Sequence, residues 1–279
     1  GYLSSLTASD WVMWKTRFSI RVSKGTHIPM IRKCYLFILT KMQHENNIAD
    51  SAYMTKLLLL SRVLLTPTVE DGVWTREQRC QWVMADDWSH FTLGAFKRAR
   101  KPDARRVSDK DFNNNKHKRA TSLMRDGEIA RAFKALQSVN VARMSSSEVY
   151  DILEALHPSR EGDYELPRAP RDLPETDLDC NVVKRMISQA SKSITPCGIS
   201  SLRYDLLKQM IGSLHTDEER TFLEKLTWLL SGIINSKLAA DAEDVTRMTQ
   251  GMTIPKKDSR PRPLGLRETL VNLACKSLL

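Results

Sequence analysis

The spacing of apolar residues predicts helices through the first hundred positions of the chain. Between residues 30 and 42 the apolar positions recur every three or four residues, which is the period of a helix with one buried face; they are Met30, Cys34, Phe37, Ile38 and Met42. The same spacing predicts helices after Ser51, after a capping box formed by Thr75 and Gln78, and after Asp87. These elements together predict a helical module over residues 1–96.

Helical spacing is lost over residues 97–116, which read KRARKPDARRVSDKDFNNNK. This composition is typical of a linker or of a basic arm that contacts nucleic acid. Helices then resume with HKRATSLMRD and GEIARAFKAL. In the second of these, the pattern predicts that Ile129, Phe133 and Leu136 face inward and that the basic residues face outward.

The last hundred residues add further helices and one short stretch of β structure. Helices are predicted over 179–192, 200–213 and 217–237, the last with Thr216 as its N-cap. Near the end, MTIP and RPLGL flank KKDSR, which predicts a hairpin with a basic tip. The predicted fold class is therefore mainly α, with a helical region over 117–279 that ends in a short β-hairpin.

Charge is distributed in blocks along the chain. The net charge is +10, and residues 97–143 hold 14 Lys or Arg against 5 Asp or Glu. Residues 148–179 reverse this balance, with 10 acidic and 3 basic side chains. Such blocks indicate a surface that faces a polyanion. For residues 97–119 a solvated, flexible basic linker remains the alternative interpretation.

Several classes of protein are disfavoured by what the sequence lacks. The longest apolar run, LLLLSRVLL at 57–65, is shorter than the roughly 20 residues that span a bilayer, so no membrane partner is expected. The five cysteines form no C-x-x-C pair, which argues against structural zinc and favours buried thiols in a reducing compartment. Walker A, G-x-G-x-x-G and G-x-S-x-G motifs are absent, and no cofactor is expected.

Five blocks of sequence, taken in order, resemble the amino-terminal half of a reverse transcriptase of the type without long terminal repeats. The first four are LLLLSRVLLTP, RCQWVMADDW, KRATSLMRDGEIARAFKALQS with ILEALHPSR, and KSITPCGISSLRYDLLKQM. The fourth departs from the family's Ser-x-Gly-x-Asp-Gly-Ile at Pro196, Cys197 and Gly198. The fifth, IPKKDSRPRPLGL, is similar to the first pair of fingers strands, which reads Pro-x-x-Lys-x-x-x-x-Arg-Pro-Ile in that family.

The resemblance implies that the chain ends in fingers whose basic residues contact RNA. Lys256, Lys257, Arg260 and Arg262 then stand where contacts to template or triphosphate are made. The basic arm supplies the other candidates. The predicted RNA-binding residues are Lys97, Arg98, Arg100, Lys101, Arg105, Arg106, Lys116, Lys118, Arg119, Lys256, Lys257, Arg260 and Arg262.

Catalysis is not expected from this chain. In the family that it resembles, the aspartates that hold two metal ions belong to the palm, which follows the fingers, and the chain is interpreted as truncated before the palm. VMADDW at 83–88 is similar to the palm signature but precedes the fingers. Asp86 and Asp87 are instead predicted to cap a helix that starts near Trp88. No catalytic, metal-binding or cofactor-binding residue is predicted.

These observations lead to three functional hypotheses. The first is a non-catalytic RNA-binding scaffold, derived from a reverse transcriptase, that contacts neighbouring proteins in a ribonucleoprotein. A mitochondrial ribosome is the specific form of that hypothesis, with the nucleus and the cytoplasm as alternative locations. The second is the amino-terminal portion of an active retroelement reverse transcriptase. The third is a protein-interaction module whose basic segments bind acidic proteins.

Overall fold

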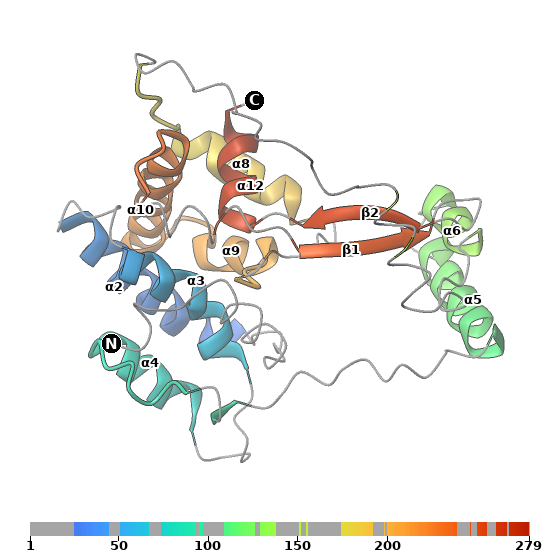
Figure 1. Cartoon of the computed structure of the whole chain (residues 1–279), viewed down its shortest axis with the longest axis horizontal. Helices are drawn as coiled ribbons and strands as arrows, with labels where there is room; N and C mark the ends of the chain where they lie inside the picture. The colour runs from blue at the N-terminus through green and yellow to red at the C-terminus, as the bar shows by residue number, and fades with distance from the viewer. Residues whose placement is uncertain are drawn as a thin grey trace. The chain divides into compact units, whose positions relative to one another are not determined.

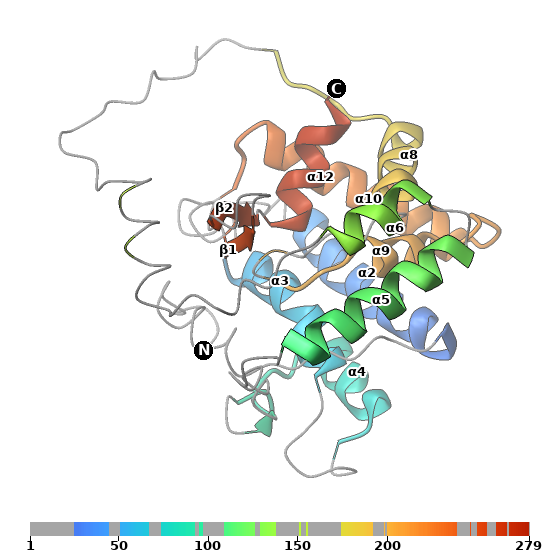
Figure 2. The same cartoon turned by 90° about the vertical axis from the view of Figure 1, so that its right-hand side faces the viewer.

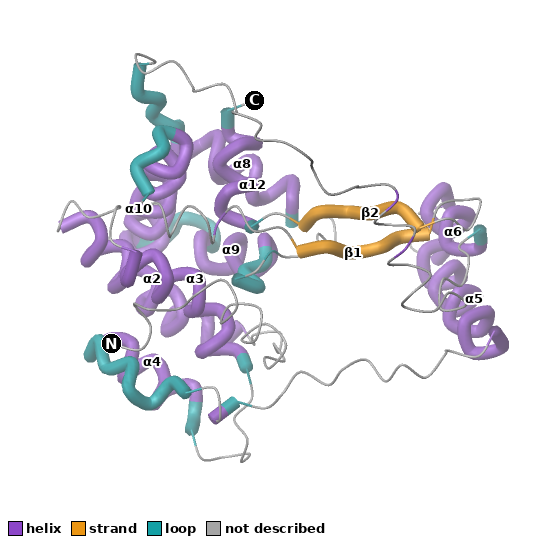
Figure 3. The backbone as a smooth tube through the Cα atoms, in the orientation of Figure 1, coloured by secondary structure: helices purple, strands orange, loops and turns teal. Residues whose placement is uncertain are grey.

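The structure is a computed structural model of the chain, and the residues that it describes are mainly helical, which confirms the predicted mainly α class (Figures 1 and 3). It describes residues 25–44, 51–66, 74–92, 95–96, 109–125, 129–137, 151, 155, 174–191, 198, 200–238, 246, 250–255, 261–266 and 268–278. For residues 250–255 and 261–266 the description covers the backbone.

The chain divides into two compact units. The first contains residues 1–100, 173–250 and 266–279, and the second contains residues 101–172 and 251–265. The helices of the first unit are η2 (Gly25–His27), α2 (Ile28–His44), α3 (Ser51–Leu65), α4 (Arg76–Met84), α8 (Cys180–Ala190), α9 (Tyr204–Ile211), α10 (Asp217–Ile234) and α12 (Thr269–Ser277). The other elements are α5 (Asp109–Arg125), α6 (Ile129–Leu136) and the strands β1 (Gln250–Pro255) and β2 (Pro261–Leu266).

Local side-chain chemistry starts two of these helices as the sequence predicts. At α4 the Gln78 backbone N–H donates to Thr75 Oγ1 at 3.2 Å, and the Thr75 N–H donates to Gln78 Oε1 at 2.9 Å. Thr216 and Glu219 form the same reciprocal box at the start of α10. Each box satisfies backbone donors that have no partner inside the helix. The predicted capping box at Thr75 and the predicted N-cap at Thr216 are both confirmed.

Helix α2 lies at the centre of the first unit (Figure 1). It packs against α3 and α4 on one side and against α9 and α10 on the other. The buried apolar residues of α2 include Ile31, Ile38 and Met42. The ring of Tyr35 meets that of Phe222 from α10 edge to face, with 6.4 Å between the centroids. Burial of each such side chain stabilises the fold by about 1.5–3 kcal/mol.

This packing differs from the predicted division of the chain into 1–96, 97–116 and 117–279. Helices that precede residue 97 share one core with helices that follow residue 200. Helix α5 begins at Asp109, so the second half of the predicted linker is helical. The reason is that α2 is apolar over a broad surface, and periodicity shows that this surface is buried without showing which helix covers it.

An ionic network joins α2, α9 and α10. Arg32 is only 6% exposed; its Nη1 atom donates to the carbonyl of Met210 at 3.0 Å and lies 3.0 Å from Glu219 Oε1. The second carboxylate oxygen of Glu219 accepts from the His215 N–H at 2.9 Å. Burial raises the pKa of Glu219, but hydrogen bonds from Arg32 and from the backbone N–H groups lower that pKa by more, so the net shift is downward.

The predicted helix after Asp87 is wrong. Residues 85–92 form turns and irregular backbone, and Asp86 has φ of 55°. Asp86 Oδ1 accepts from Lys56 Nζ at 2.7 Å and from Trp88 Nε1 at 3.1 Å, while Asp87 Oδ1 accepts from the hydroxyl of Ser89 at 2.6 Å. These bonds, two of them local and one to the distant Lys56, stabilise a turn, because aspartates form such side-chain bonds readily and tolerate the left-handed region.

Strands β1 and β2 pair in a two-stranded sheet. Residues 256–260, the tip of the predicted hairpin, lie outside the described residues, so the basic tip stays a prediction. Within the part of the chain that the structure describes, none of the helices combines the length and the apolar content needed to cross a bilayer.

Candidate nucleic-acid interface

The structure describes few of the predicted RNA-binding residues. Lys116, Lys118 and Arg119 lie in α5, and Arg262 lies in β2, where only the backbone is described. The remaining predicted residues lie outside the described part of the chain: Lys97, Arg98, Arg100, Lys101, Arg105, Arg106, Lys256, Lys257 and Arg260.

Charge changes sign along α5. Asp109 and Asp111 stand in its first turn with Lys110 between them, where a helix favours negative charge, and four further basic residues follow from position 116 onward. Lys118 and Arg119 are exposed, whereas Lys116 is half-buried and Ala120 is buried. One turn of this helix therefore presents two predicted RNA-binding cations to solvent.

Helix α6 shows a different face from the one that the sequence predicts. Ile129 and Phe133 are 58% and 57% exposed, so the prediction that they face inward is wrong. Helices α5 and α6 lie side by side (Figure 2). Among their described side chains, those of Ala120 and Ala132 are buried. Ile129 and Phe133 are four residues apart, so they lie together on a face of α6 that is exposed.

Two basic segments that are distant in the sequence belong to the same compact unit. The second unit contains the carboxyl part of the basic arm, with seven Lys or Arg between residues 101 and 119. It also contains residues 251–265, which hold four basic residues and one acidic residue. Predicted RNA-binding residues from two distant segments of the sequence thus belong to one unit.

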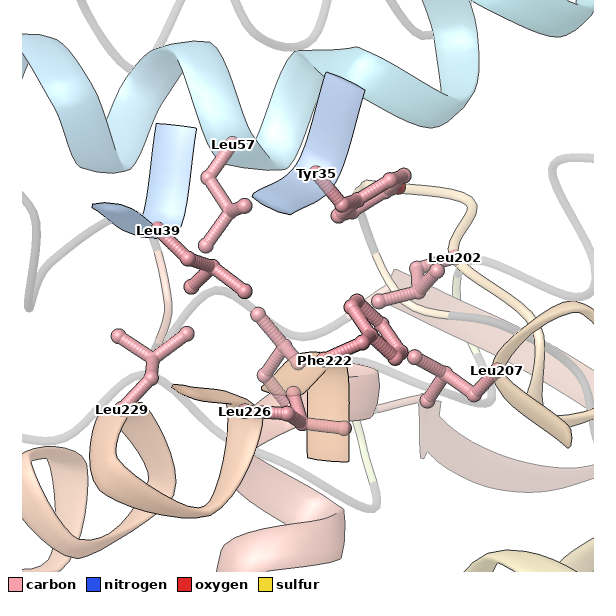
Figure 4. A pocket seen from close by; sticks show the side chains of 9 residues that line it. Tyr35, Leu39, Leu57, Leu202, Leu207, Phe222, Leu226 and Leu229 are labelled. Atoms are coloured by element: carbon pink, nitrogen blue, oxygen red, sulfur yellow. The ribbon is translucent and has the colours of Figure 1, made fainter. Parts of the chain in front are cut away.

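A small apolar cavity lies inside the first unit (Figure 4). Its volume is about 10 Å³, and its walls are side chains of α2, α3, α9, α10 and α12 with Leu202. The hydroxyl of Tyr35 is hydrogen-bonded to Ser61 at 2.7 Å, and burial raises the pKa of this tyrosine. A space of this size, lined by apolar side chains, has room for one water at most, so we interpret it as a packing gap in the core.

A buried polar cluster, which the sequence did not predict, joins the loop before α9 to the start of α12. The backbone N–H and the hydroxyl of Ser200 donate to the two carboxylate oxygens of Glu268 at 2.9 and 2.6 Å. The hydroxyl of Thr269 donates to the carbonyl of Leu202 at 2.6 Å. Burial first, and then the charge of Glu268, raise the pKa of Tyr204 to about 12. The sequence pattern that could have predicted this cluster is an acidic residue, Glu268, directly before the apolar helix α12.

The acidic pair in VMADDW is engaged in the turn described above. Asp86 accepts hydrogen bonds from Lys56 and Trp88. Hydrogen bonds from Ser89 lower the pKa of Asp87. Among the described residues, no group of three or more His, Cys, Asp and Glu side chains is arranged to hold a metal ion. The four free cysteines in this part of the chain include Cys34 and Cys80, which are both buried.

Comparisons with protein-family profiles, with curated proteins and with solved structures found no match to this chain. The resemblance to reverse transcriptases therefore depends on the sequence blocks alone.

Proposed function

We propose that this chain is a non-catalytic, reverse-transcriptase-derived RNA-binding subunit that acts as a scaffold in a ribonucleoprotein. The observation that carries the proposal is the grouping of residues 101–172 with residues 251–265 in one compact unit. That grouping collects two basic segments that are separated by more than a hundred residues in the sequence. A long polyanion is the ligand that two such segments fit best.

The exposed cations of α5 support a contact to phosphates. Lys118 and Arg119 donate charge-assisted hydrogen bonds of the kind that phosphate oxygens accept. Contacts of this type position a protein on RNA without reading its sequence. Their affinity falls as the salt concentration rises, because the release of counterions from RNA is then less favourable. We therefore propose binding that is general in sequence and steep in its dependence on salt.

The ribonucleoprotein that we propose is a mitochondrial ribosome, in which the helical first unit contacts neighbouring proteins and the second unit contacts RNA. Support comes from the basic character of the chain, with a net charge of +10. Cosedimentation of the endogenous protein with ribosomal subunits from purified mitochondria tests this narrower proposal. Recovery in the ribosome-free fraction at low salt argues against it.

Replacement of Lys256, Lys257, Arg260 and Arg262 with serine tests the RNA-binding proposal. We expect weaker binding to RNAs of unrelated sequence alike, and a salt slope of log K that is smaller by about 3, since each phosphate contact contributes about 0.7–0.9. Fluorescence anisotropy over a salt titration measures both quantities. A loss confined to one RNA sequence contradicts the proposal.

A matched control removes the same charge from the first unit. Lys33, Lys41, Lys208 and Lys237 are all exposed, and their replacement with serine lowers the net charge equally. We expect this variant to keep the wild-type salt slope. Equal losses in the two variants mean that net charge alone attracts RNA.

Two further experiments test the alternative hypotheses. Primer extension on an RNA template with Mg²⁺ tests the active-polymerase alternative. Binding of acidic proteins without RNA binding at low salt favours the interaction module.

A further inference from the structure

Three large apolar side chains are exposed on the α5–α6 pair. Met124 in the last turn of α5 is 52% exposed, and Ile129 and Phe133 of α6 are 58% and 57% exposed. Ile129 and Phe133 are four residues apart, so they lie on one face of α6. Large apolar side chains that gather on a surface normally mark a binding site. We call these three residues the apolar surface of the α5–α6 pair.

Exposed cations stand on the same helix pair. Lys118, Arg119 and Arg125 of α5 are exposed, and residues 118 to 125 span about 10 Å along the helix axis at 1.5 Å per residue. The pair therefore combines exposed positive charges on α5 with an exposed aromatic ring and an aliphatic neighbour on α6. An RNA duplex offers phosphates to such a surface but keeps the faces of its bases stacked inside. A single strand offers both phosphates and unstacked bases.

We propose that the α5–α6 pair binds single-stranded RNA, with phosphates on Lys118, Arg119 and Arg125 and an unpaired base stacked on the ring of Phe133 and packed against Ile129. The inference rests on the proposed function and deepens it by naming the form of RNA. An acidic helix of a partner protein is the other ligand with suitable charge. A single strand of RNA is favoured over an acidic helix because the second unit contains basic residues outside α5 as well, within residues 101–108 and 256–262. A long polyanion can contact all of them.

Substitution of Phe133 separates stacking from apolar contact. Phe133→Leu keeps an apolar side chain but removes the π-face, and Phe133→Tyr keeps the ring. We expect Phe133→Leu to weaken binding of an oligouridine by about tenfold or more, because stacking of one base contributes about 1–3 kcal/mol. Phe133→Tyr should bind the oligouridine as the wild type does. Binding of an RNA duplex of equal length should be the same in all three proteins.

A direct readout comes from Phe133→Trp. We expect oligouridine to quench the introduced tryptophan beyond the change seen in the wild-type protein, and the duplex to leave it unchanged. Because residue 133 is largely exposed, these substitutions should leave the thermal unfolding midpoint unaltered, and that measurement confirms that each variant is folded.

The outcomes distinguish this inference from the proposed function. Equal affinity of the wild type for both forms of RNA, or wild-type affinity of Phe133→Leu for oligouridine, overturns the single-strand inference and leaves general RNA binding in place. Quenching of the introduced tryptophan by anionic phospholipid vesicles but not by oligouridine also overturns it. Absence of binding to either RNA at low salt overturns both proposals.

Discussion

Gly212 ends α9 in a backbone conformation that residues with a side chain rarely adopt. Its φ is 60° and its ψ is −141°, in a region populated almost only by glycine. A Cβ atom added at this position would overlap Oε1 of Glu219. That carboxylate is held in place by Arg32 and by the N–H groups of His215 and Thr216, so it has no simple way to move aside.

We predict that Gly212→Ala destabilises the chain by at least about 1–3 kcal/mol, since the backbone conformation alone costs that much for alanine. Chemical denaturation monitored by circular dichroism measures the change in the free energy of unfolding. Gly25→Ala is the matched control, because a Cβ atom at Gly25 meets nothing within 4 Å, and it should change stability little. Equal stability of the two variants would contradict the strain at Gly212.

At the scale of elements, the first turn of α10 is stabilised by one carboxylate with three roles. Glu219 completes the capping box of Thr216, accepts from the loop that precedes the helix, and pairs with the buried Arg32 of α2. Because its pKa is lower in the folded chain than its ordinary value of 4.5, the unfolded chain binds the proton more readily. Its contribution to stability is therefore present above pH 4.5 and is lost as pH falls through the folded-state pKa.

We predict that Glu219→Gln lowers the free energy of unfolding by about 1–3 kcal/mol at neutral pH, since the buried Arg32 loses the closer and more buried of its two carboxylate partners. The difference from the wild type should shrink as the pH is lowered below 4.5, and denaturation over a pH series measures it. Glu218→Gln is the control, because its side chain is 45% exposed and its ion pairs contribute about 0–1 kcal/mol. A difference that persists unchanged in acid would refute the assignment.

At the scale of the whole molecule, the first unit is assembled from segments that are far apart in the sequence. The buried residues of α2 and α3 form one core with those of α9, α10 and α12. Arg32 adds a hydrogen bond to Met210, across 178 positions of the chain. A fragment that contains only residues 1–96 would expose the faces of α2 that α9 and α10 cover.

We predict that a fragment of residues 1–96 does not unfold cooperatively, in contrast to the chain from which it is taken. The reason is that removal of α9 and α10 uncovers part of the apolar surface that stabilises α2. Thermal unfolding followed by circular dichroism compares the two. A sharp transition in the fragment would show that residues 1–96 fold without the helices that follow residue 200, and would contradict this prediction.

Much of the local structure was predictable from the sequence, because it depends on neighbours along the chain. Thr75 with Gln78 is a reciprocal pair three residues apart, and Thr216 caps α10 as expected, since such contacts form within one turn. The turn at Asp86 was missed because its carboxylate is held by Lys56, thirty positions away. For the candidate interface, the sequence located the exposed cations of α5 but placed Ile129 and Phe133 on the wrong side of α6.

The amino-acid sequence by itself determined where the capped helices α4 and α10 begin, that the described chain is mainly α, and where its positive charge is concentrated, because hydrogen-bonded caps, apolar periodicity and charge counts are local properties. Only the tertiary structure decided which helices share a core, that Glu219 pairs with the buried Arg32, and that Ile129 and Phe133 of α6 are exposed. These features depend on which surfaces meet in space, and a periodic pattern describes a surface without identifying its partner.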